Sequence, residues 1–498
     1  MTVFSLWGCS SHPDPNTLAM VIEFSPTNLD PRVGTDAQSE FIDELLFDSL
    51  VRKDQNFNLV PAAAERWEIP DPRTYVFHLR RGIRFHDGRP LTSKDVKWTL
   101  DTMRDGSLLS IKGATYALVD RVETPDDLTV AVHLKEPFAP LLWNLSEGAF
   151  GIVPAGSGKE FKNNPIGSGP FRFVRNDPDS QVVITRNDDY WGERPRVERI
   201  RFAVVPDDTT RALELRKGSA DLAPANSFAP DMVRTLERER NIMVQRHSGT
   251  SLAYLAFNLR DPVLKDVRVR QALAYAIDRQ TILHYLLGDS GRLASSVLPP
   301  EHWAYDPEVT AYPYDPAKAN SLLDAAGYPR AQDGVRLHLT MKTSTVESAR
   351  LLAAVLQQQL RQVGVALDIR TYEFATFYSD VTKGAFQLYS LRWIGYSNQD
   401  PDIFEDAFHS ASFAPRRANR GYYSNPQVDR LLEEGRRTVD QEQRKRIYSE
   451  VQRILARDLP YINLWYLDNV LVHSPRVRNV HLGVSADYQF LTTAELAP

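Results

Sequence analysis

The stretch of sequence that decides the fold is RTYVFHLRRGIRFHDGRPLTSKDVKWTL, residues 73–100. Residues 75–79 alternate large apolar side chains with others, a period of two that predicts a β-strand with one buried face. Asp87-Gly88 predicts a turn shortly after that strand. Thr92 and Asp95 have the spacing of a capping box, and apolar residues follow them at helical intervals. This one stretch therefore predicts a strand, a turn and a helix, which are the units of a mixed α/β fold.

Helices and strands alternate in the later part of the chain as well. Residues 315–329 predict a helix that begins after Asp315, with proline in its first position, and ends at Gly327. Residues 349–364 predict a longer helix with one apolar face, and residues 365–369 alternate as a strand directly after it. A helix followed at once by a strand is an α/β unit. These patterns predict mixed α/β architecture throughout, but they do not set domain boundaries.

The composition is that of an ordinary globular protein. The chain has 498 residues, of which 42% are hydrophobic and 25% charged, so its length predicts two or three domains. The net charge is −5, and Lys and Arg are scattered rather than gathered in a basic patch, which argues against nucleic acid as a partner. No stretch approaches the ~20 consecutive apolar residues of a membrane-spanning helix. The 20 tyrosines and 8 tryptophans are enough to line a large cleft for a polar ligand.

The single cysteine, Cys9, lies in SLWGCSSHPDP, residues 5–15, where it can form neither an internal disulfide nor a four-cysteine metal site. Residues 6–9 resemble a bacterial lipobox, in which the cysteine is acylated, and the polar residues after it suit a tether. Only residues 1–8 precede the cysteine and none is basic, unlike a signal peptide, so either the true start lies upstream or the leader is not functional. We expect export with a lipid anchor at Cys9, and a chance cysteine near a terminus is the alternative.

Four blocks of the sequence, in order, resemble the dipeptide- and oligopeptide-binding proteins of peptide-type ABC importers, the bacterial extracellular solute-binding protein family 5. The first block, residues 45–100, carries the family's tryptophan, its Tyr-x-Phe-x-Leu-Arg strand and its Phe-His-Asp-Gly turn. The other three are NPIGSGPFRF (164–173), NDDYWG (187–192) and the run at 257–283. Any one block is weak evidence. Together they extend the resemblance over almost the whole chain.

We expect these blocks to serve the fold rather than the ligand. Gly167, Gly169 and Pro170 fit a tight entry into a strand that begins at Phe171, and they lack the strand-to-helix context of a phosphate-binding loop. Arg268, Arg270 and Asp278 are predicted to lie on a helix and to form interdomain or surface ion pairs of small individual value.

The resemblance implies an α/β fold of the periplasmic binding protein type II-like class, with two lobes, an extra N-terminal domain and a hinged cleft that closes on ligand. Two strands or crossovers between the lobes would act as the hinge, and the closed form is what the membrane permease recognises. The implied segments are a lipoprotein leader and tether (1–14), a discontinuous lobe I (15–43, 165–250 and 470–498), an additional domain packed on lobe I (44–164) and lobe II (251–469).

The position that similar proteins use to anchor a peptide differs in this chain. In those proteins a tryptophan is followed three residues later by an aspartate that receives the α-ammonium of the peptide, whereas here Trp393 is followed by Tyr396. A buried ammonium without an anion costs at least several kcal/mol, so the usual anchor is missing at that position. Asp400 or Asp402 could replace it from the next loop, although Asp-Pro-Asp is more often turn and helix-cap chemistry. Alternatively, Trp393 and Tyr396 could offer aromatic faces to a cation or a sugar.

The resemblance also implies other cleft residues. The segment 23–31 lines the cleft in similar proteins, and Lys342 falls near the arginine that dipeptide binders use for the ligand carboxylate, an exposed strand-end lysine being the alternative. Tyr254 and Asn258 are expected near the hinge, and Arg392 could pair with an acid instead of ligand. The candidate ligand-binding residues are therefore Ser25, Thr27, Tyr254, Asn258, Lys342, Arg392, Trp393, Tyr396, Asn398 and Asp400.

An enzyme is the first competing class. The sequence has no HExxH, GxSxG or Walker-type loop, and its eleven histidines are dispersed. His86-Asp87 lies in a predicted turn, and Glu433-Glu434 point about 100° apart on a helix. We therefore expect no catalytic residues, no metal ligands and no cofactor.

We expect a monomeric substrate-binding component of an ABC importer, on the periplasmic or cell-surface side of the cytoplasmic membrane. It would capture a peptide or peptide-like solute and deliver it to the permease subunits. An oligosaccharide, an opine or another non-peptide solute is the alternative, because Tyr396 replaces the anchoring aspartate. A purely structural envelope lipoprotein is a third possibility.

Overall fold

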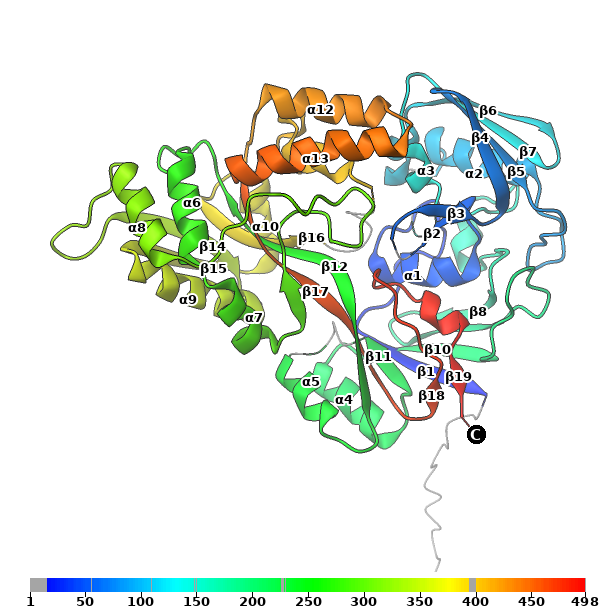
Figure 1. The fold of residues 1–498 in the computed structure, drawn as a ribbon. Helices are drawn as coiled ribbons and strands as arrows, with labels where there is room; N and C mark the ends of the chain where they lie inside the picture. Colours follow the sequence, from blue (N-terminus) through cyan, green and yellow to red (C-terminus); the bar gives the residue numbers. More distant parts are fainter. Residues whose placement is uncertain are drawn as a thin grey trace, which may run out of the picture.

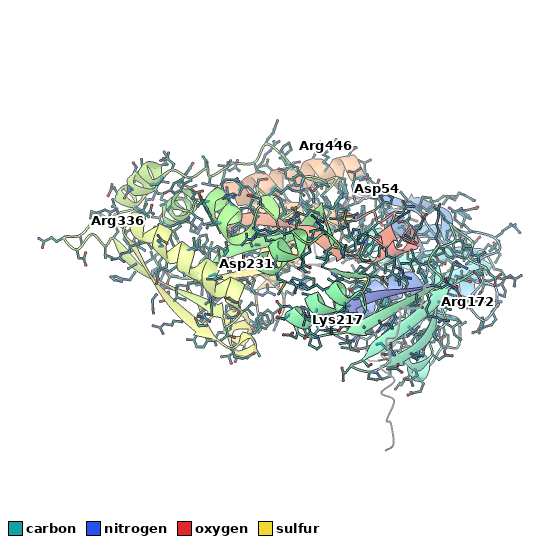
Figure 2. The ribbon with its side chains drawn as sticks, turned by 90° about the horizontal axis from the view of Figure 1, so that it is seen from below. Asp54, Arg172, Lys217, Asp231, Arg336 and Arg446 are labelled. Carbon is teal, nitrogen blue, oxygen red and sulfur yellow. The ribbon has the colours of Figure 1, made fainter. Side chains whose placement is uncertain are left out.

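The computed structural model describes residues 16–54, 56–108, 110–146, 148, 150–224, 228, 230–393 and 400–497. Cys9, Tyr396 and Asn398 lie outside the described residues. No helix in these ranges is long and apolar enough to cross a membrane. Charged side chains are spread over the molecule, with Arg336 and Arg172 near opposite ends in Figure 2.

One 11-stranded sheet runs through the molecule in the order β15-β14-β16-β12-β17-β11-β1-β10-β9-β8, and β13 pairs with β17. In sequence order the strands are β1 (Thr17–Ile22), β8 (Phe171–Asp177), β9 (Gln181–Arg186), β10 (Arg199–Val204), β11 (Leu222–Pro224), β12 (Met243–Phe257), β13 (Gly291–Leu293), β14 (Leu337–Ser344), β15 (Val365–Tyr372), β16 (Leu388–Trp393) and β17 (Tyr461–His473). Figure 1 shows β12 and β17 as the long strands that cross from one half of the molecule to the other.

The pair β12–β17 joins two half-sheets. At one end of this pair, near Met243 and His473, β17 also pairs with β11. At the other end, residues 252–257 of β12 pair with β16. Between these parts the register shifts, from His247 to Ser251. Gly249 lies in this shift, where a Cβ atom would stand 2.2 Å from the carbonyl oxygen of Leu467. The two connecting strands that the sequence implied are therefore present, and a glycine lies at their irregular point.

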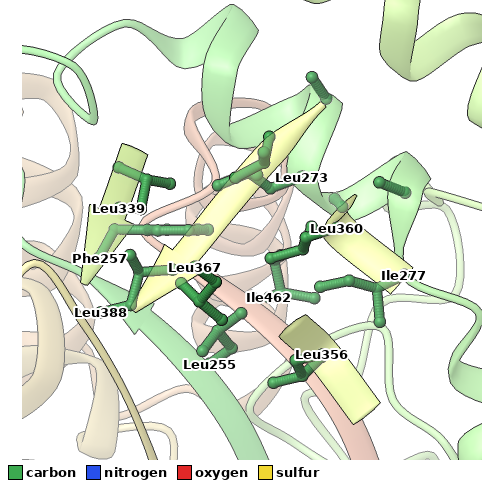
Figure 3. Packing of buried hydrophobic residues seen from close by; sticks show 14 of the residues in the cluster. Leu255, Phe257, Leu273, Ile277, Leu339, Leu356, Leu360, Leu367, Leu388 and Ile462 are labelled. Carbon is green, nitrogen blue, oxygen red and sulfur yellow. The ribbon is translucent and has the colours of Figure 1, made fainter. Parts of the chain in front are cut away.

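Helices cover both faces of the half-sheet built on β12, β14, β15 and β16. Alternate residues of β12 point to opposite faces: Leu255 and Phe257 pack in one core, and Leu252 and Tyr254 in the other. Figure 3 shows the first core, where strand residues meet those of α6 and α9. The helices of this half are α6 (Val267–Ala276), α7 (Arg279–Leu287), α8 (Pro316–Ala325), α9 (Glu347–Gln362), α10 (Phe374–Thr382), α11 (Ile403–Phe408), η5 (Ser410–Ser412), α12 (Pro426–Arg437) and α13 (Gln441–Asp458).

The other half-sheet draws its core from both ends of the chain. Leu18 and Met20 of β1 share a core with Val477 and Leu491, near the C-terminus. The rings of Phe202 and Tyr488 stack there, with centroids 5.6 Å apart. The remaining elements of this half are α1 (Ala37–Leu46), α4 (Asp208–Lys217), α5 (Pro230–Glu237), β18 (Val477–Arg478), η6 (Gln489–Thr492) and β19 (Glu495–Leu496).

A separate four-stranded sheet, β4-β5-β7-β6, has a core of its own. Residues 73–100 belong to this unit, and the strand, the turn and the helix predicted there are confirmed. The backbone N–H of Thr92 donates to the carboxylate of Asp95 over 2.7 Å, which caps α2. The elements of this unit are β2 (Val51–Lys53), β3 (Leu59–Pro61), β4 (Ala64–Asp71), β5 (Thr74–Leu79), α2 (Ser93–Arg104), η1 (Ile111–Tyr116), β6 (Val119–Asp126), β7 (Thr129–Leu134), α3 (Leu141–Asn144) and η2 (Lys159–Asn163).

This four-stranded unit also contacts the half of the molecule built on β12. The rings of Trp143 and Trp303 stack with centroids 5.7 Å apart. The N–H of Ala139 donates to the carbonyl of Arg436 over 2.8 Å. Trp303 packs against the cores on both sides, so a single side chain belongs to two packing units.

The glycines before β8 are required by close packing of two backbones. A Cβ atom on Gly167 would lie 1.8 Å from the carbonyl oxygen of Leu46, and one on Gly169 would lie 2.6 Å from the carbonyl carbon of the same residue. The predicted start of a strand at Phe171 is confirmed, and the chain enters it in close contact with the end of α1.

The prediction for the charged residues near α6 is only partly correct. Arg268 forms the predicted surface ion pair, with Asp266. Asp278 instead caps α7, where it accepts from the N–H of Thr281. Arg270 is 4% exposed, and its guanidinium donates to main-chain carbonyls of Leu264, Lys265, Asp458 and Leu459. The prediction of an ion pair is wrong for Arg270, because the end of α13 offers carbonyls without helical partners.

Candidate ligand-binding site

Three strands of each half-sheet, β14, β15 and β16 in one and β1, β10 and β11 in the other, point their carboxyl ends toward the register shift in β12 and β17. β16 runs antiparallel to β12 and ends with Trp393 opposite Leu252. β11 runs antiparallel to β17 and ends with Pro224 opposite Leu471. β14 and β15 run parallel to β16, and β1 and β10 run parallel to β11.

Open α/β sheets bind ligands outside the carboxyl ends of their strands. We therefore define the interlobe edge as the segments that follow these strands, together with Trp393. These segments are residues 23–30, 205–207, 345–346 and 373–378. Residues 225–227 and 394–399, which follow β11 and β16, lie outside the described residues.

Large apolar side chains are exposed along the interlobe edge. The exposed fractions are 61% for Phe24, 51% for Val346, 48% for Phe374 and 39% for Tyr378. The rings of Phe374 and Tyr378 stack with centroids 6.0 Å apart. A group of exposed apolar side chains is typical of a binding surface. No motif in the sequence indicated these residues, although Phe24, Val346 and Phe374 each lie two positions after the end of a strand.

Behind this surface lies a cluster of aromatic rings. Tyr254 is fully buried, and its ring lies 4.4 Å from that of Tyr461 and 6.1 Å from that of Trp393. The indole Nε1 of Trp393 is buried and donates to no described residue. The structure thus brings two predicted site residues, Tyr254 and Trp393, into one cluster, with Trp393 at its half-buried border.

Arg420 packs on this cluster, and the sequence analysis did not identify it. The guanidinium carbon lies 5.5 Å from the ring centres of both Trp393 and Tyr378. Its Nη1 is 3.4 Å from the Tyr254 hydroxyl and its Nη2 is 3.1 Å from the Tyr378 hydroxyl. Arg420 stands in a loop of the chain before α12, and no local pattern of residues distinguishes it from the neighbouring arginines.

Several predicted site residues already have partners in the protein. The Lys342 ammonium is 2.6 Å from a carboxylate oxygen of Asp380, so its charge is compensated. Thr27 donates its hydroxyl to Asp36, the N-cap of α1. The Ser25 hydroxyl accepts from the N–H of Asp179 over 3.3 Å.

Arg392 differs from these residues. It lies at the end of β16, is exposed and forms no ion pair with any described residue.

Asp400 and Asp402 do not replace the missing aspartate anchor. Asp400 forms a bidentate pair with Arg444, at 3.0 and 2.9 Å, and the Arg444 side chain is completely buried. Asp402 lies 2.9 Å from a nitrogen of Arg436. Because both carboxylates neutralise arginines of α12 and α13, the geometry does not support a role for Asp400 in holding a ligand ammonium.

Asn258 lies away from the candidate site. It follows the carboxyl end of β12, whereas the register shift is in the first half of that strand. Its side-chain amide donates to the carbonyls of Gly384 and Phe386, at 3.1 and 2.9 Å. Asn258 therefore lies at the opposite end of β12 from the register shift, and its amide holds the segment before β16.

Within the described ranges, no group of three or more His, Cys, Asp or Glu residues could hold a metal ion. The site is instead a surface of aromatic rings with one arginine on it, suited to non-covalent binding of an organic solute.

The chain is similar to known proteins over most of its length. The model of bacterial extracellular solute-binding proteins, family 5 Middle, matches residues 58–415. The chain is 28% identical to the dipeptide-binding protein of Escherichia coli K12 over 473 residues, which cover 89% of this chain and 88% of that protein. It is 30% identical to the glutathione-binding protein GsiB of Pectobacterium atrosepticum over 450 residues, which cover 88% and 86%.

Two solved structures illustrate the likeness in three dimensions. The substrate-binding protein CtaP of Listeria monocytogenes has a TM-score of 0.86 at 25% identity, with 96% of this chain and 99% of that chain covered. DppA of Helicobacter pylori, solved with the peptide STSA, has a TM-score of 0.76 at 25% identity, with 96% and 98% covered.

Proposed function

The chain belongs to the bacterial extracellular solute-binding proteins of family 5, and from this premise we propose that its solute is a peptide, which it delivers to the permease subunits of an ABC importer. The type II periplasmic binding protein fold expected from the sequence is confirmed. The observation that carries the proposal is the convergence of strand carboxyl ends from both half-sheets on a surface of exposed aromatic and aliphatic side chains.

The hydrophobic cores support the division of the chain into two lobes and an additional domain. We propose lobe I as residues 15–43, 165–250 and 470–498, the additional domain as 44–164, and lobe II as 251–469. The cores follow this division in large part, although residues 45–47 and Val153 belong to the core of lobe I, and Trp98 and Phe161 pack against it. The additional domain then includes a short segment whose side chains belong to its neighbour.

Closure of the two lobes is the proposed mechanism. A solute that contacts both sides of the interlobe edge binds the closed arrangement more tightly than the open one. The difference between these two binding free energies is the amount by which the solute stabilises the closed arrangement. The register shift around Gly249 is the natural place for bending, because the ladder between β12 and β17 is interrupted there. The solute enters and leaves chemically unchanged.

A thermal-shift screen tests the proposed solute class. Purified protein is heated with pooled dipeptides, tripeptides and tetrapeptides, and separately with pooled oligosaccharides. A peptide present at 100 times its dissociation constant adds about 2.7 kcal/mol to the free energy of unfolding, so we expect a clear rise in Tm with peptides alone. A rise with oligosaccharides only would contradict the proposal, and so would recovery of cleaved peptides after incubation.

We further propose a lipid anchor at Cys9 and a position on the outer side of the cytoplasmic membrane. The support is the lipobox-like sequence before Cys9 and the polar residues after it. Labelling of growing cells with radioactive palmitate should mark the wild-type protein and not Cys9→Ser. Equal labelling of both proteins would exclude Cys9 as the attachment point.

A further inference from the structure

We propose that Arg420 binds a carboxylate of the solute, so that lobe II holds the solute by its negative group. This inference rests on the proposed function only in that the solute binds at the interlobe edge. It assigns a ligand contact to a residue outside the strands and motifs identified from the sequence.

Arg420 is a cation without an anion in the described part of the chain. No carboxylate of the described residues forms an ion pair with it, and its polar contacts there are the hydroxyls of Tyr254 and Tyr378. Its Nε is buried and donates to no described residue. A largely desolvated guanidinium without a counter-ion is costly, and a carboxylate of the solute would supply that counter-ion.

The carboxylates of this region are already paired with other cations. Asp380, one turn or less from Tyr378 on α10, pairs with Lys342. Asp400 pairs with Arg444. The sequence of residues 394–399, IGYSNQ, contains no acidic residue. Arg392 also lacks an ion pair with a described residue, but it alternates with Trp393 along β16 and so lies on the opposite face of the sheet. On the face that carries Trp393, Arg420 is a cation without a described carboxylate, which selects an anionic group in the solute.

The rings around Arg420 also favour this role. Stacking on Trp393 and Tyr378 holds the guanidinium plane in place, so little side-chain entropy is lost when a carboxylate binds. A guanidinium offers paired N–H groups that match the two oxygens of a carboxylate. Tyr378, which is 39% exposed, places this arginine beside the open surface of the interlobe edge.

A competition between matched peptide pools tests the inference. Tripeptides of identical sequences are prepared with a free carboxyl terminus, with a C-terminal amide, and with an acetylated N-terminus. The protein is incubated with equimolar pools, separated from unbound peptide by gel filtration, and the retained peptides are quantified by mass spectrometry. We expect free acids to be enriched at least tenfold over amides, and acetylation to reduce retention by less than threefold.

Variants assign the preference to Arg420. In Arg420→Gln the enrichment of free acids should fall to about one, whereas Arg420→Lys should keep part of it. Arg416→Gln is the matched control, because Arg416 is exposed in the same loop, and it should behave as wild type. Circular dichroism melting of each variant verifies that it is folded.

The possible outcomes separate this inference from the proposed function. Equal retention of acids and amides by the wild type, or undiminished enrichment in Arg420→Gln, would overturn the role of Arg420 while leaving peptide binding intact. If no pool is retained, the peptide proposal fails, and the small molecules that copurify with the protein decide the role of Arg420. A carboxylate-bearing molecule present with wild type and lost from Arg420→Gln supports the inference. The inference is overturned if the copurifying molecule is neutral or cationic, or if wild type and Arg420→Gln carry equal amounts of it. It is also overturned if no small molecule copurifies with the wild type.

Discussion

His86 illustrates how a single side chain can join two parts of this protein. Its Nδ1 accepts from the N–H of Gly167 over 3.2 Å, and its Nε2 lies 3.1 Å from the carbonyl of Gly169. Only the neutral ring can accept at one nitrogen and donate at the other. Burial is the main reason that the pKa of His86 falls to about 4. The neighbouring Asp87 pairs with Arg89 at the surface, so the two residues form a structural turn.

The low pKa of His86 predicts a pH-dependent stability. The ring of the unfolded chain takes up its proton near pH 6.5, whereas the folded chain does so only near pH 4. As the pH falls through this window, the free energy of unfolding should decrease by up to about 3 kcal/mol, and above pH 7 this contribution should be constant. Urea unfolding at pH 7.5, 5.5 and 4.5 measures the effect.

His86→Gln is the control for this prediction. Its free energy of unfolding should fall less over the same pH range, since glutamine does not titrate. If wild type and variant lose stability in parallel between pH 6.5 and 4.5, His86 is not the group responsible.

At the scale of elements, buried polar contacts hold the ends of helices. Arg270 of α6 satisfies carbonyls at the end of α13, a helix almost 190 positions later in the chain. The last carbonyls of a helix lack partners within it and carry a partial negative charge. One arginine therefore joins the two helices without a carboxylate.

Replacement of Arg270 should lower the free energy of unfolding more than replacement of Arg268. In Arg270→Leu, several buried carbonyls lose their donor, so we expect a decrease of about 3 kcal/mol or more in the free energy of unfolding. Arg268→Leu, on the same helix, removes an exposed pair with Asp266 and should cost about 1 kcal/mol or less. Chemical denaturation of both variants is the measurement, and equal losses would show that Arg270 has no special role.

The segment at Gly167 lies in close contact with the end of α1. This contact gives a second prediction at the scale of elements. Gly167→Ala places a Cβ atom against the Leu46 carbonyl, so one backbone must move, and the free energy of unfolding should fall by about 2 kcal/mol or more. Gly158→Ala is the matched control, because no atom lies within 4 Å of its added Cβ. Thermal unfolding compares them. A Gly167→Ala variant as stable as Gly158→Ala would contradict the backbone contact.

For the whole molecule, the additional domain connects the two lobes by a second route besides β12 and β17. The Trp143–Trp303 stack lies beside Arg444, whose guanidinium is 5.1 Å and 5.4 Å from the two ring centres. The side-chain amide of Gln441 also donates to the side chain of Asn58. These contacts stabilise the arrangement in which lobe II meets the additional domain.

Truncation of Trp303 should shift the molecule toward a more open arrangement. Trp303→Ala weakens the contact between the two cores, so the fraction of binding-competent molecules falls and the apparent dissociation constant for peptide rises severalfold. Small-angle X-ray scattering should show a larger radius of gyration without ligand. Tyr285→Ala, at a side chain that is 76% exposed on α7, should change neither quantity. Unchanged affinity and radius in Trp303→Ala would show that this contact does not control closure.

The amino-acid sequence by itself determined the local elements and the family of this protein. The strand at Thr74–Leu79, the capped helix α2 and the unit α9–β15 were predictable, because apolar periods and caps act between residues a few positions apart. The order of the family blocks likewise determined the two-lobed fold. Each of these signals is read along the chain without knowledge of distant contacts.

Only the tertiary structure decided which polar side chains remain available for a solute. Lys342, Asp400 and Asn258 have the right chemistry in the sequence, yet each is taken by a partner 38 to 128 positions away. Arg420 looks ordinary in the sequence, and within the described ranges its side chain contacts the aromatic residues Tyr254, Tyr378 and Trp393 and pairs with no carboxylate. The physical reason is that the pairing of charges and donors depends on proximity in space, which the folding of distant segments creates.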